Sequence, residues 1–446
     1  MNRYKAVLSL TGLIFTFINF PIFSQEKPNI LIIFTDDQGY ADLGCFGSKV
    51  HRTPVLDRLA KEGTKYTNFY AQTVCGPSRS ALLTGRYPNR SLGWSMPASE
   101  ITWAELMQKA GYDTACIGKW DVSNRKPIVP RMPNAQGFNY YFGTLGANDE
   151  GKVTYHENNQ LAGSSTNMAE LTRFYTDKAI DYLKNKRDAS KPFVLYLSHT
   201  MLHTDIDASP KFKGKSKGGL YGDAVEELDY ETGRLLNVLD ELKLTKNTIV
   251  IYTTDNGPWN QPAYRNREKG HPAGTKFWGD NDPLRAGKGS SYEGGLRVPC
   301  IIRWPDKIAA GAKSEAVFAT IDFLPTFANI CGFDIPEDRI IDGVDQTELL
   351  LNQQGQREDF FYMNPKPKSS KFAVNGIRLG KWKYLRPKMV VPGYAKEIGR
   401  KEKVELYNLE KDMSEKNNLA NKHPELIEKL EKHIALWESS QTKKIK

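Results

Sequence analysis

The sequence contains no internal repeat and no low-complexity block, and its basic residues form no long run. The missing repeats argue against a repeat architecture. The formal charge is +10, from 62 basic and 52 acidic side chains, which suits a polyanionic partner such as a charged glycan, nucleic acid or a membrane surface. Basic residues cluster only in a short tail at Lys443, Lys444 and Lys446, so we expect no nucleic-acid partner.

The N-terminus has the pattern of an export signal. Arg3 and Lys5 form a basic n-region, residues 6–23 are apolar, and cleavage near Ser24 would remove a signal peptide of residues 1–24. A permanent membrane anchor is the alternative, because the apolar stretch is long. Pro21 and the strand-like run just beyond it favour cleavage. We therefore expect an exported chain, periplasmic or secreted, without a permanent membrane anchor.

Four short apolar runs are each followed by polar residues. The runs cover residues 29–34, 114–117, 193–197 and 248–252, and the intervening residues 53–63, 103–111, 170–185 and 222–243 have helical patterns. Continuous apolar runs are typical of strands covered on both faces. The alternation predicts an α/β fold with a large, mostly parallel or mixed sheet sandwiched by helices. Ligands of such sheets bind beyond the carboxyl ends of the strands.

Two of these runs end in acidic and amide residues, Asp36 and Asp37 after the first and Asp255 and Asn256 after the last. All four offer oxygen ligands, which select a hard cation such as Ca²⁺ or Mg²⁺ rather than zinc. Either segment alone is more often an ordinary turn. Together they predict a metal site.

The segment from Cys75 to Arg86, CGPSRSALLTGR, places a cysteine at the start of a short helix. Pro77 suits the first helical position and Gly85 can end the helix. The free N–H groups of a helix N-terminus stabilise an anion or polar nucleophile, and Arg79 can fork onto the oxygens of an anionic ester. A buried cysteine before an ordinary helix is the alternative. The segment closely resembles the signature of formylglycine-dependent sulfatases, in which this cysteine is oxidised to an aldehyde.

That resemblance implies an alkaline-phosphatase-like fold and several site residues. One Ca²⁺ per chain would be held by Asp36, Asp37, Asp255, Asn256 and the modified Cys75. The family's sulfate-binding and substrate-facing positions match Arg79, Lys119 in GKW, Lys288 in GKGSSYEGGLRVP and His203, whereas His199 would be a structural neighbour. Conversion of Cys75 implies a partner, a formylglycine-generating or anaerobic sulfatase-maturing enzyme.

The sequence departs from the family at Asp121. Relatives usually have Gly-Lys-Trp-His, and this chain has Gly-Lys-Trp-Asp. The family histidine is thought to serve as base when sulfate leaves the enzyme. Asp121 follows Lys119 by two residues, so in extended geometry both side chains would point to one face. An aspartate can act as a base, but Lys119 would keep its pKa low. A base, an orienting role and a structural role all stay open.

The C-terminal part has a different pattern. Residues 377–384 and 406–409 predict strands, and residues 423–437 predict a helix that is apolar at Leu426, Leu430 and Ile434. We therefore divide the mature chain into a catalytic domain, residues 25–345, and a small antiparallel α+β subdomain, residues 346–446.

The cysteine count is five, which is odd for an exported chain. If Cys75 is converted, the remaining four could form two disulfides. Cys116 and Cys300 lie in apolar strand-like runs, so buried free thiols are at least as plausible.

These patterns and the resemblance predict an exported sulfatase that hydrolyses O-sulfate esters of a carbohydrate. A phosphatase or phosphonate hydrolase of the same superfamily is one alternative. Its zinc-type members need a Ser or Thr nucleophile and a histidine-rich two-metal site, and this chain has only seven histidines. The other alternative is a catalytically weak glycan-binding relative, suggested by Asp121. Substrate specificity is expected in the loops of residues 123–163 and 258–285.

Overall fold

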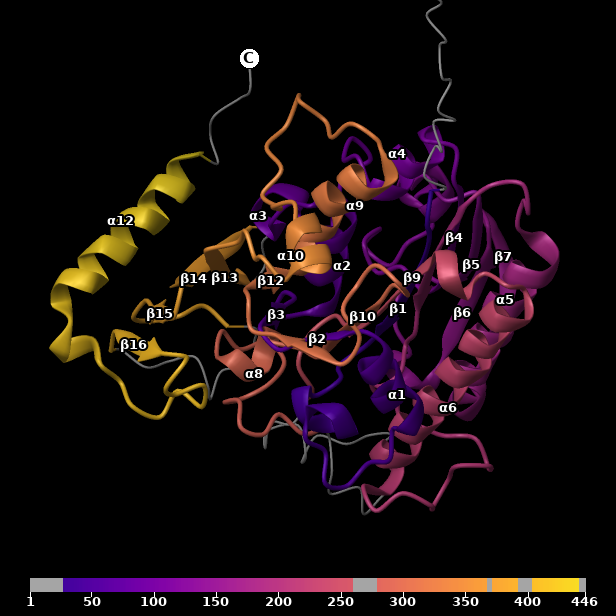
Figure 1. Ribbon diagram of the computed structural model, residues 1–446, viewed down its shortest axis with the longest axis horizontal. Helices are drawn as coiled ribbons and strands as arrows, with labels where there is room; N and C mark the ends of the chain where they lie inside the picture. The colour runs from indigo at the N-terminus through magenta and orange to yellow at the C-terminus, as the bar shows by residue number, and fades with distance from the viewer. Residues whose placement is uncertain (1–26, 260–278, 367–370, 392–402, 441–446) are drawn as a thin grey trace, which may run out of the picture.

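The computed structural model describes residues 27–259, 279–366, 371–391 and 403–440. Its centre is a ten-stranded mixed sheet with the order β11-β2-β10-β9-β1-β8-β4-β5-β6-β7 (Figure 1). The strands are β1 Asn29–Thr35, β2 Thr64–Tyr66, β4 Asp113–Lys119, β5 Tyr140–Thr144, β6 Val153–Glu157, β7 Gln160–Ser165, β8 Phe193–Ser198, β9 Thr248–Thr254, β10 Cys300–Arg303 and β11 Ala312–Ser314. The predicted signal peptide, residues 1–24, lies outside the described residues. Within them, no helix combines the length and apolar character that crossing a membrane requires.

The middle of the sheet is parallel, as predicted. Strands β9, β1, β8, β4 and β5 pair in parallel, and antiparallel β10 and β6 follow on either side. Every residue of β1 is buried. Ile30 and Ile32 enter one hydrophobic core and Leu31 and Ile33 the other. This two-sided burial explains the continuous apolar run, because successive side chains of a strand point to opposite faces.

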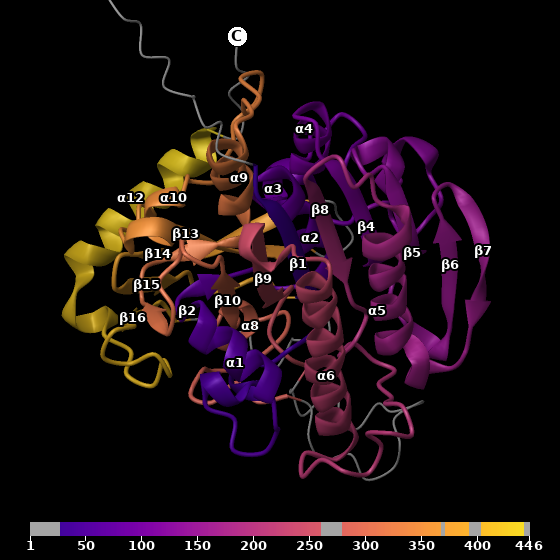
Figure 2. The same cartoon turned by 45° about the vertical axis from the view of Figure 1, so that its right-hand side comes forward.

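Helices cover both faces of the sheet. On one face lie α1 Pro54–Glu62, α5 Leu171–Asp181 and α6 Gly219–Glu241 (Figure 2). The other face carries α2 Cys75–Thr84, α4 Trp103–Lys109, α9 Phe323–Cys331 and α10 Thr347–Asn352. A short α3, Pro88–Ser91, follows α2, and β3 Phe69–Tyr70 pairs with β12 Phe318–Ala319 in a separate two-stranded sheet. The fold is therefore the predicted α/β sandwich.

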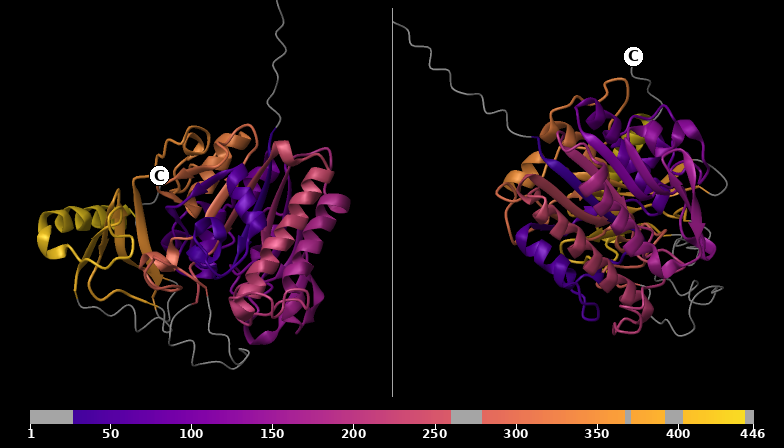
Figure 3. Two further views of the ribbon diagram at one scale, coloured as in Figure 1. Left: turned by 60° about the horizontal axis from the view of Figure 1, so that its bottom comes forward. Right: turned by 90° about the vertical axis from the view of Figure 1, so that its right-hand side faces the viewer.

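The C-terminal part forms a separate antiparallel sheet beside the main one (Figure 3, left). Its strands are β13 Asp359–Pro365, β14 Phe372–Leu379, β15 Trp382–Leu385 and β16 Glu405–Asn408, and α12 Pro424–Ser440 packs on it. Leu430 and Ile434 of α12 are fully buried, as the sequence predicted. Residues 377–384 are a hairpin rather than one strand, because the chain turns at Gly380 with φ 54°.

The proposed division at residue 345 stays a prediction. Helix α10 begins two residues later, yet Leu349 and Leu350 join the core of the main sheet. The two sheets are also linked by buried charge. Glu293, in the short α8 Glu293–Leu296, lies 2.9 Å from Lys383 of β15 and accepts hydrogen bonds from Tyr70 and Tyr362. This contact ties α8, which leads into β10 of the main sheet, to the C-terminal sheet.

All five cysteines are free thiols in the structure. Cys116, Cys300 and Cys331 are buried, whereas Cys45 is half-buried. The alternative of two disulfides is therefore not what the structure shows.

Candidate active site

The polar residues predicted at strand ends converge at the carboxyl ends of the central strands of the sheet. Asp36 and Asp37 follow β1, Lys119 ends β4, and Asp255 follows β9. His203 lies in the loop after β8, and Cys75 is the first residue of α2. The acidic side chains and Cys75 each place one ligand atom within 4.8 Å of the others. The structure thus brings together residues more than 200 positions apart, although their chemical roles stay predictions.

Cys75 lies at the centre of this cluster and is 3% exposed. Its Sγ is 3.4 Å from Asp36 Oδ1 and 3.3 Å from Lys288 Nζ. Burial, with the charges of Asp255 and Asp36, raises the pKa of the Cys75 thiol well above its usual range. The thiolate is therefore disfavoured here, and the unmodified side chain is a poor nucleophile.

Helix α2 begins at Cys75, so Pro77 occupies the third helical position rather than the predicted first one. This costs no hydrogen bond, because the first four N–H groups of a helix lack intrahelical acceptors. Gly85 ends the helix in a left-handed conformation, φ 67°, as predicted. A Cβ on Gly76 would lie 2.2 Å from the Trp94 ring, so only glycine permits this close approach.

Arg79, one turn into α2, is fully buried and holds the acidic residues in place. Its Nη2 donates to Asp36 Oδ2 at 3.0 Å and to Asp255 Oδ2 at 2.8 Å. Its Nη1 donates to the Lys119 carbonyl at 3.2 Å and to the Ser198 hydroxyl. One guanidinium thus joins the ends of β1, β4, β8 and β9.

The three carboxylates have different proton affinities. Burial raises the pKa of Asp37 to about 7, with Lys288 opposing and Asp36 and Asp255 adding to the rise. Burial and the charge of Asp36 likewise raise the pKa of Asp255. At Asp36 burial also acts to raise the pKa, but the surrounding basic groups, of which Lys119 contributes most, together outweigh it, and the pKa falls well below its usual range. A dense set of buried carboxylates of this kind is stabilised by further positive charge.

The donor set fits a hard cation such as Ca²⁺. The four residues at the ends of β1 and β9 offer oxygen atoms, which hard cations prefer. Asn256 Nδ2 donates to Asp37 Oδ1 at 2.6 Å, whereas Asn256 Oδ1 is buried without a hydrogen-bond partner among the described residues. A buried unpaired carbonyl oxygen needs an explanation, and coordination of a cation provides one.

Lys288 and His203 close the other side of the cluster. Lys288 Nζ lies 2.7 Å from Asp37 Oδ1 and makes a cation–π contact with Trp259, 4.5 Å from the centre of its ring. His203 Nε2 lies 3.8 Å from Asp37 Oδ2. Burial, with the charges of Lys288 and Lys119, lowers the pKa of His203 to about 3, so the ring is neutral at pH 7. His203 Nδ1 is 2.7 Å from the Thr204 carbonyl, which only accepts, so Nδ1 carries the proton and Nε2 faces the carboxylate.

Asp121 belongs to the same network through its partners. Its Oδ2 is 3.7 Å from Lys119 Nζ and accepts from Trp94 Nε1 at 3.2 Å, and its Oδ1 accepts from Arg125 Nε at 2.8 Å. The expected extended geometry is wrong at this residue, where φ is 55°. Both carboxylate oxygens of this fully buried side chain therefore already accept hydrogen bonds from cationic or indole donors.

Arg125, Asp149 and Trp94 also belong to this network and were not predicted from the sequence. Arg125 lies between Asp121 and Asp149, and Asp149 Oδ1 is 3.7 Å from His203 Nδ1. Arg125 follows Asp121 by four residues, a spacing that pairs opposite charges on a helix, but residues 121–125 form no helix, so the spacing did not predict this pair. Asp149 begins a single 3₁₀ turn, Asp149–Gly151, whose sequence carries no such signal. His199 is a buried neighbour of Tyr175, as expected, and residues 260–278 of the predicted specificity loop lie outside the described residues.

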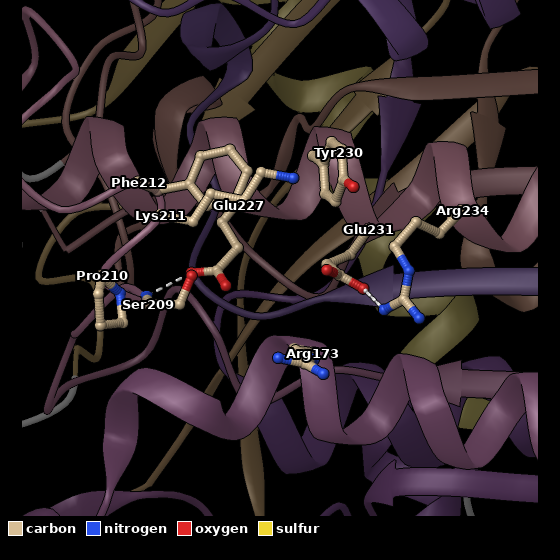
Figure 4. A pocket seen from close by; sticks show the side chains of 9 residues that line it. All are labelled: Arg173, Ser209, Pro210, Lys211, Phe212, Glu227, Tyr230, Glu231 and Arg234. Atoms are coloured by element: carbon tan, nitrogen blue, oxygen red, sulfur yellow. Dashed lines mark hydrogen bonds and ion pairs between the residues drawn. The ribbon is translucent and has the colours of Figure 1, made fainter.

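A separate cavity of about 380 Å³ lies between α5 and α6, and the loop of residues 209–212 borders it (Figure 4). Acidic side chains line this cavity beside the cationic ones. Arg234 pairs with Glu231 at 2.6 Å, and Glu227 accepts a hydrogen bond from the Ser209 backbone amide. Lys211 lies 3.2 Å from the centre of the Tyr230 ring. This cavity contains none of the predicted site residues.

Comparison with known proteins assigns the family. A model described as Sulfatase matches residues 28–333, and one described as N-sulphoglucosamine sulphohydrolase, C-terminal, matches residues 287–440. The N-acetylgalactosamine-6-O-sulfatase of Bacteroides thetaiotaomicron is 31% identical, covering 91% of this chain and 92% of its own length. The human steryl-sulfatase is 33% identical, covering 76% and 73%.

Solved structures agree on the fold. A Bacteroides thetaiotaomicron sulfatase described with the metabolism of multiple glycosaminoglycans superposes with a TM-score of 0.79 at 29% identity, covering 94% of this chain and 100% of that one. The phosphonate monoester hydrolase of Silicibacter pomeroyi shares the fold at a TM-score of 0.67 and 18% identity, covering 93% and 96%.

A mixed sheet covered by helices, with the acidic and basic cluster at the carboxyl ends of its central strands, defines the alkaline-phosphatase-like class. Within that class the chain belongs to the sulfatase family, whose model covers most of its length. It is a sulfuric ester hydrolase.

Proposed function

We propose that this protein is an exported sulfatase that cleaves O-sulfate esters of a carbohydrate with a formylglycine made from Cys75 and one bound Ca²⁺. The observation that carries the proposal is the position of Cys75, at the first turn of α2 and within hydrogen-bond reach of Asp36 and Lys288. Export is supported by the signal-like pattern of residues 1–24.

The environment of Cys75 favours a modified side chain over a thiolate. Because burial and nearby carboxylates raise the pKa of the thiol, the unmodified residue cannot supply a reactive anion at neutral pH. Oxidation by a maturing enzyme would convert it to an aldehyde, and the hydrated aldehyde offers hydroxyl groups for attack on sulfur. Maturation must precede or accompany folding, since Cys75 is 3% exposed in the folded chain.

The cation would be held by Asp36, Asp37, Asp255, Asn256 and the modified Cys75. When bound, it would supply positive charge to the nucleophile and to the sulfate oxygens. Burial of these donors keeps competing water away from the site, which strengthens each electrostatic contact.

Three cations of the chain would bind the sulfate group. Lys119 and Lys288 are almost fully buried, and Arg79 holds Asp36 and Asp255 in position. Donors fixed in advance stabilise the charge that builds up on sulfate oxygens as the ester bond breaks. His203 is neutral in this structure, and an adjacent sulfate would raise its pKa, which would let it protonate the leaving alcohol.

Asp121 is better placed to orient Lys119 than to accept a proton. We expect Asp121→Asn to lower kcat/KM by about ten- to a hundredfold, because an amide cannot balance Lys119 and Arg125 together. Substrate binding and chemistry should weaken together, without accumulation of sulfated enzyme. Pre-steady-state kinetics with intact-mass detection will check this.

Trp94→Phe is the matched control, because it removes a single hydrogen bond to Asp121 and leaves the two cations. It should cause a smaller loss of the same kind. A burst of one turnover followed by a stalled sulfated enzyme in Asp121→Asn would instead identify Asp121 as the base. Unchanged steady turnover would contradict both roles.

A carbohydrate substrate is favoured by the extent of the similarity. The Bacteroides relative named for N-acetylgalactosamine 6-sulfate aligns along nearly its whole length, C-terminal part included, whereas steryl-sulfatase aligns over about three quarters. The second matching family model is named for a sulfated amino sugar. We therefore propose 6-sulfated N-acetylhexosamine units as the first substrates to test.

The matured enzyme should release inorganic sulfate from N-acetylgalactosamine 6-sulfate or from other sulfated mono- and oligosaccharides in a panel. Sulfate is measured by ion chromatography, and the sugar product by mass spectrometry. Steroid sulfates and the matching phosphate and phosphonate esters form the comparison arms. Hydrolysis of only those arms, or two zinc ions per chain by elemental analysis, would contradict the proposal.

A further inference from the structure

Beside the catalytic cluster, at the carboxyl end of β5, lies a cavity of about 610 Å³. Its volume is typical of ligand pockets, which span about 300–1,000 Å³. The loop after β5 forms one wall, β6 and the start of β7 form another, and Arg125 and Pro127 complete the lining. Ala147 and the exposed Leu161 add apolar surface, on which the C–H face of a sugar ring could pack.

The charge of this cavity has one sign. The charged residues of its lining are Arg125 and Lys152, and no carboxylate belongs to the lining, although Arg125 is itself paired with Asp121 and Asp149 behind it. This differs from the cavity between α5 and α6, where Glu227 and Glu231 accompany the cations (Figure 4). A cavity lined by cations alone attracts anions.

His156 gives the cavity a built polar contact. The residue is 8% exposed, and its Nδ1 is buried without a hydrogen-bond partner among the described residues. Burial lowers the pKa of His156, so the ring is neutral at pH 7 and offers one donor and one acceptor. Buried polar atoms are usually satisfied, so this nitrogen is an unused hydrogen-bonding position on a residue that lines the cavity.

Arg125 connects the cavity to the catalytic cluster. Its guanidinium contacts Asp121 and Asp149. Asp121 lies 3.7 Å from Lys119, and Asp149 lies 3.7 Å from His203. The aliphatic stem of Arg125 rests on Gly146, where an added Cβ would meet it at 3.3 Å. Arg125 of the cavity lining therefore shares one carboxylate, Asp121, with Lys119, and another, Asp149, with His203. Lys119 and His203 are the residues that would hold the scissile sulfate and its leaving oxygen.

From this geometry we propose that the cavity is a subsite for a neighbouring sugar, the unit next to the one that carries the scissile sulfate. Lys152 and His156 would select an anionic substituent on this neighbouring sugar. The proposal rests on the proposed function, since it assumes that the sulfate ester is cleaved at Cys75. Two substituents of the neighbouring sugar carry the required negative charge, a carboxylate and a second sulfate ester. Arg125 would position this unit while keeping its contact with Asp121.

The test uses matured full-length enzyme and four probes. They are N-acetylgalactosamine 6-sulfate alone, and the same unit linked to a neutral hexose, to a hexuronate or to a sulfated hexose. Lys152→Ala and His156→Gln should each raise KM about tenfold for the probes with an anionic neighbour, the size of one lost charge-assisted hydrogen bond. For the monosaccharide and the neutral disaccharide, KM and kcat should stay within about twofold of the wild type.

Lys211→Ala is the matched control, because Lys211 is also an exposed lysine that lines a cavity, the one between α5 and α6. It should leave all four probes unchanged. Comparison of the hexuronate and sulfated-hexose arms identifies which anion the subsite takes. Equal effects of Lys152→Ala on charged and neutral probes, or none at all, would overturn the subsite.

Failure of the proposed function has a different signature, which is the absence of sulfate release from every probe by wild-type enzyme. In that event, calorimetric titration of the Cys75→Ala chain with the hexuronate disaccharide still tests the cavity. Binding that weakens about tenfold in the added Lys152→Ala variant supports an anion subsite. Binding unaffected by Lys152, or no binding, refutes it.

Discussion

Replacing Cys75 by alanine should lower sulfate release by a factor on the order of 10⁴ or more, because it removes the atom from which the proposed nucleophile is made. The fold should persist, since the thiol makes only long contacts, 3.4 Å to Asp36 and 3.3 Å to Lys288. The initial rate with N-acetylgalactosamine 6-sulfate, or with the best substrate of the panel, measures the loss.

Cys331→Ala is the control for this variant. Cys331 is a buried cysteine of α9 that belongs to the core rather than to the site. Its replacement should cost stability and leave kcat within about threefold of the wild type. Intact-mass analysis should show that wild-type protein, produced beside a maturing enzyme, has lost the Cys75 thiol in favour of an aldehyde or its hydrate. Full activity of Cys75→Ala would refute the nucleophile assignment.

The sheet and the polar residues at the carboxyl ends of its central strands could be predicted because both follow from local sequence. Continuous apolar runs need burial on both faces, and parallel strands bring their carboxyl ends together. The pattern at residues 29–37 and 248–256 therefore predicted not only β1 and β9 but also the proximity of Asp36 and Asp255, which Arg79 now joins.

Other parts depend on contacts that local patterns do not encode. Asp121 was expected on an extended strand end, but the chain turns there with φ 55°, and the side chain pairs with Arg125 as well as Lys119. Asp149 reaches His203 from a single 3₁₀ turn, Asp149–Gly151, and a turn this short has no periodicity that indicates its position. Placement of Lys288 beside Cys75 came from motif resemblance, because the two residues are 213 positions apart and no local pattern brings them together.

The subsite and Asp121 are coupled through Arg125, which has consequences for specificity. Arg125 would keep its contact with Asp121 while it positions the neighbouring sugar, and Lys119 shares the same Asp121 carboxylate. Variation of residues 121–125 can therefore change both the recognition of the neighbouring sugar and the strength of sulfate binding.

Removal of Ca²⁺ should cause the second-largest loss of turnover, after loss of Cys75. The site holds the carboxylates of Asp36, Asp37 and Asp255, and burial raises the pKa of the latter two, so the folded chain gains by binding a compact positive charge there. We expect a chelator to reduce the rate by at least about a hundredfold, and added Ca²⁺ to restore it. Elemental analysis should find one calcium per chain.

Binding should also appear in the free energy of unfolding, independently of activity. At a hundredfold excess of Ca²⁺ over its Kd, a ligand that binds only the folded state adds about 2.7 kcal/mol to the free energy of unfolding.

The matched pair of variants is Asn256→Ala and Asn329→Ala. Asn256 offers the buried unpaired Oδ1, whereas Asn329 is an exposed amide of α9. Asn256→Ala should weaken Ca²⁺ binding about tenfold or more by calorimetry, and Asn329→Ala should not. Zinc as the sole bound metal, with full activity after calcium is removed, would exclude the calcium site. Equal affinities in the two variants would remove Asn256 from the ligand set, since a coordinating oxygen cannot be lost from a buried site without cost.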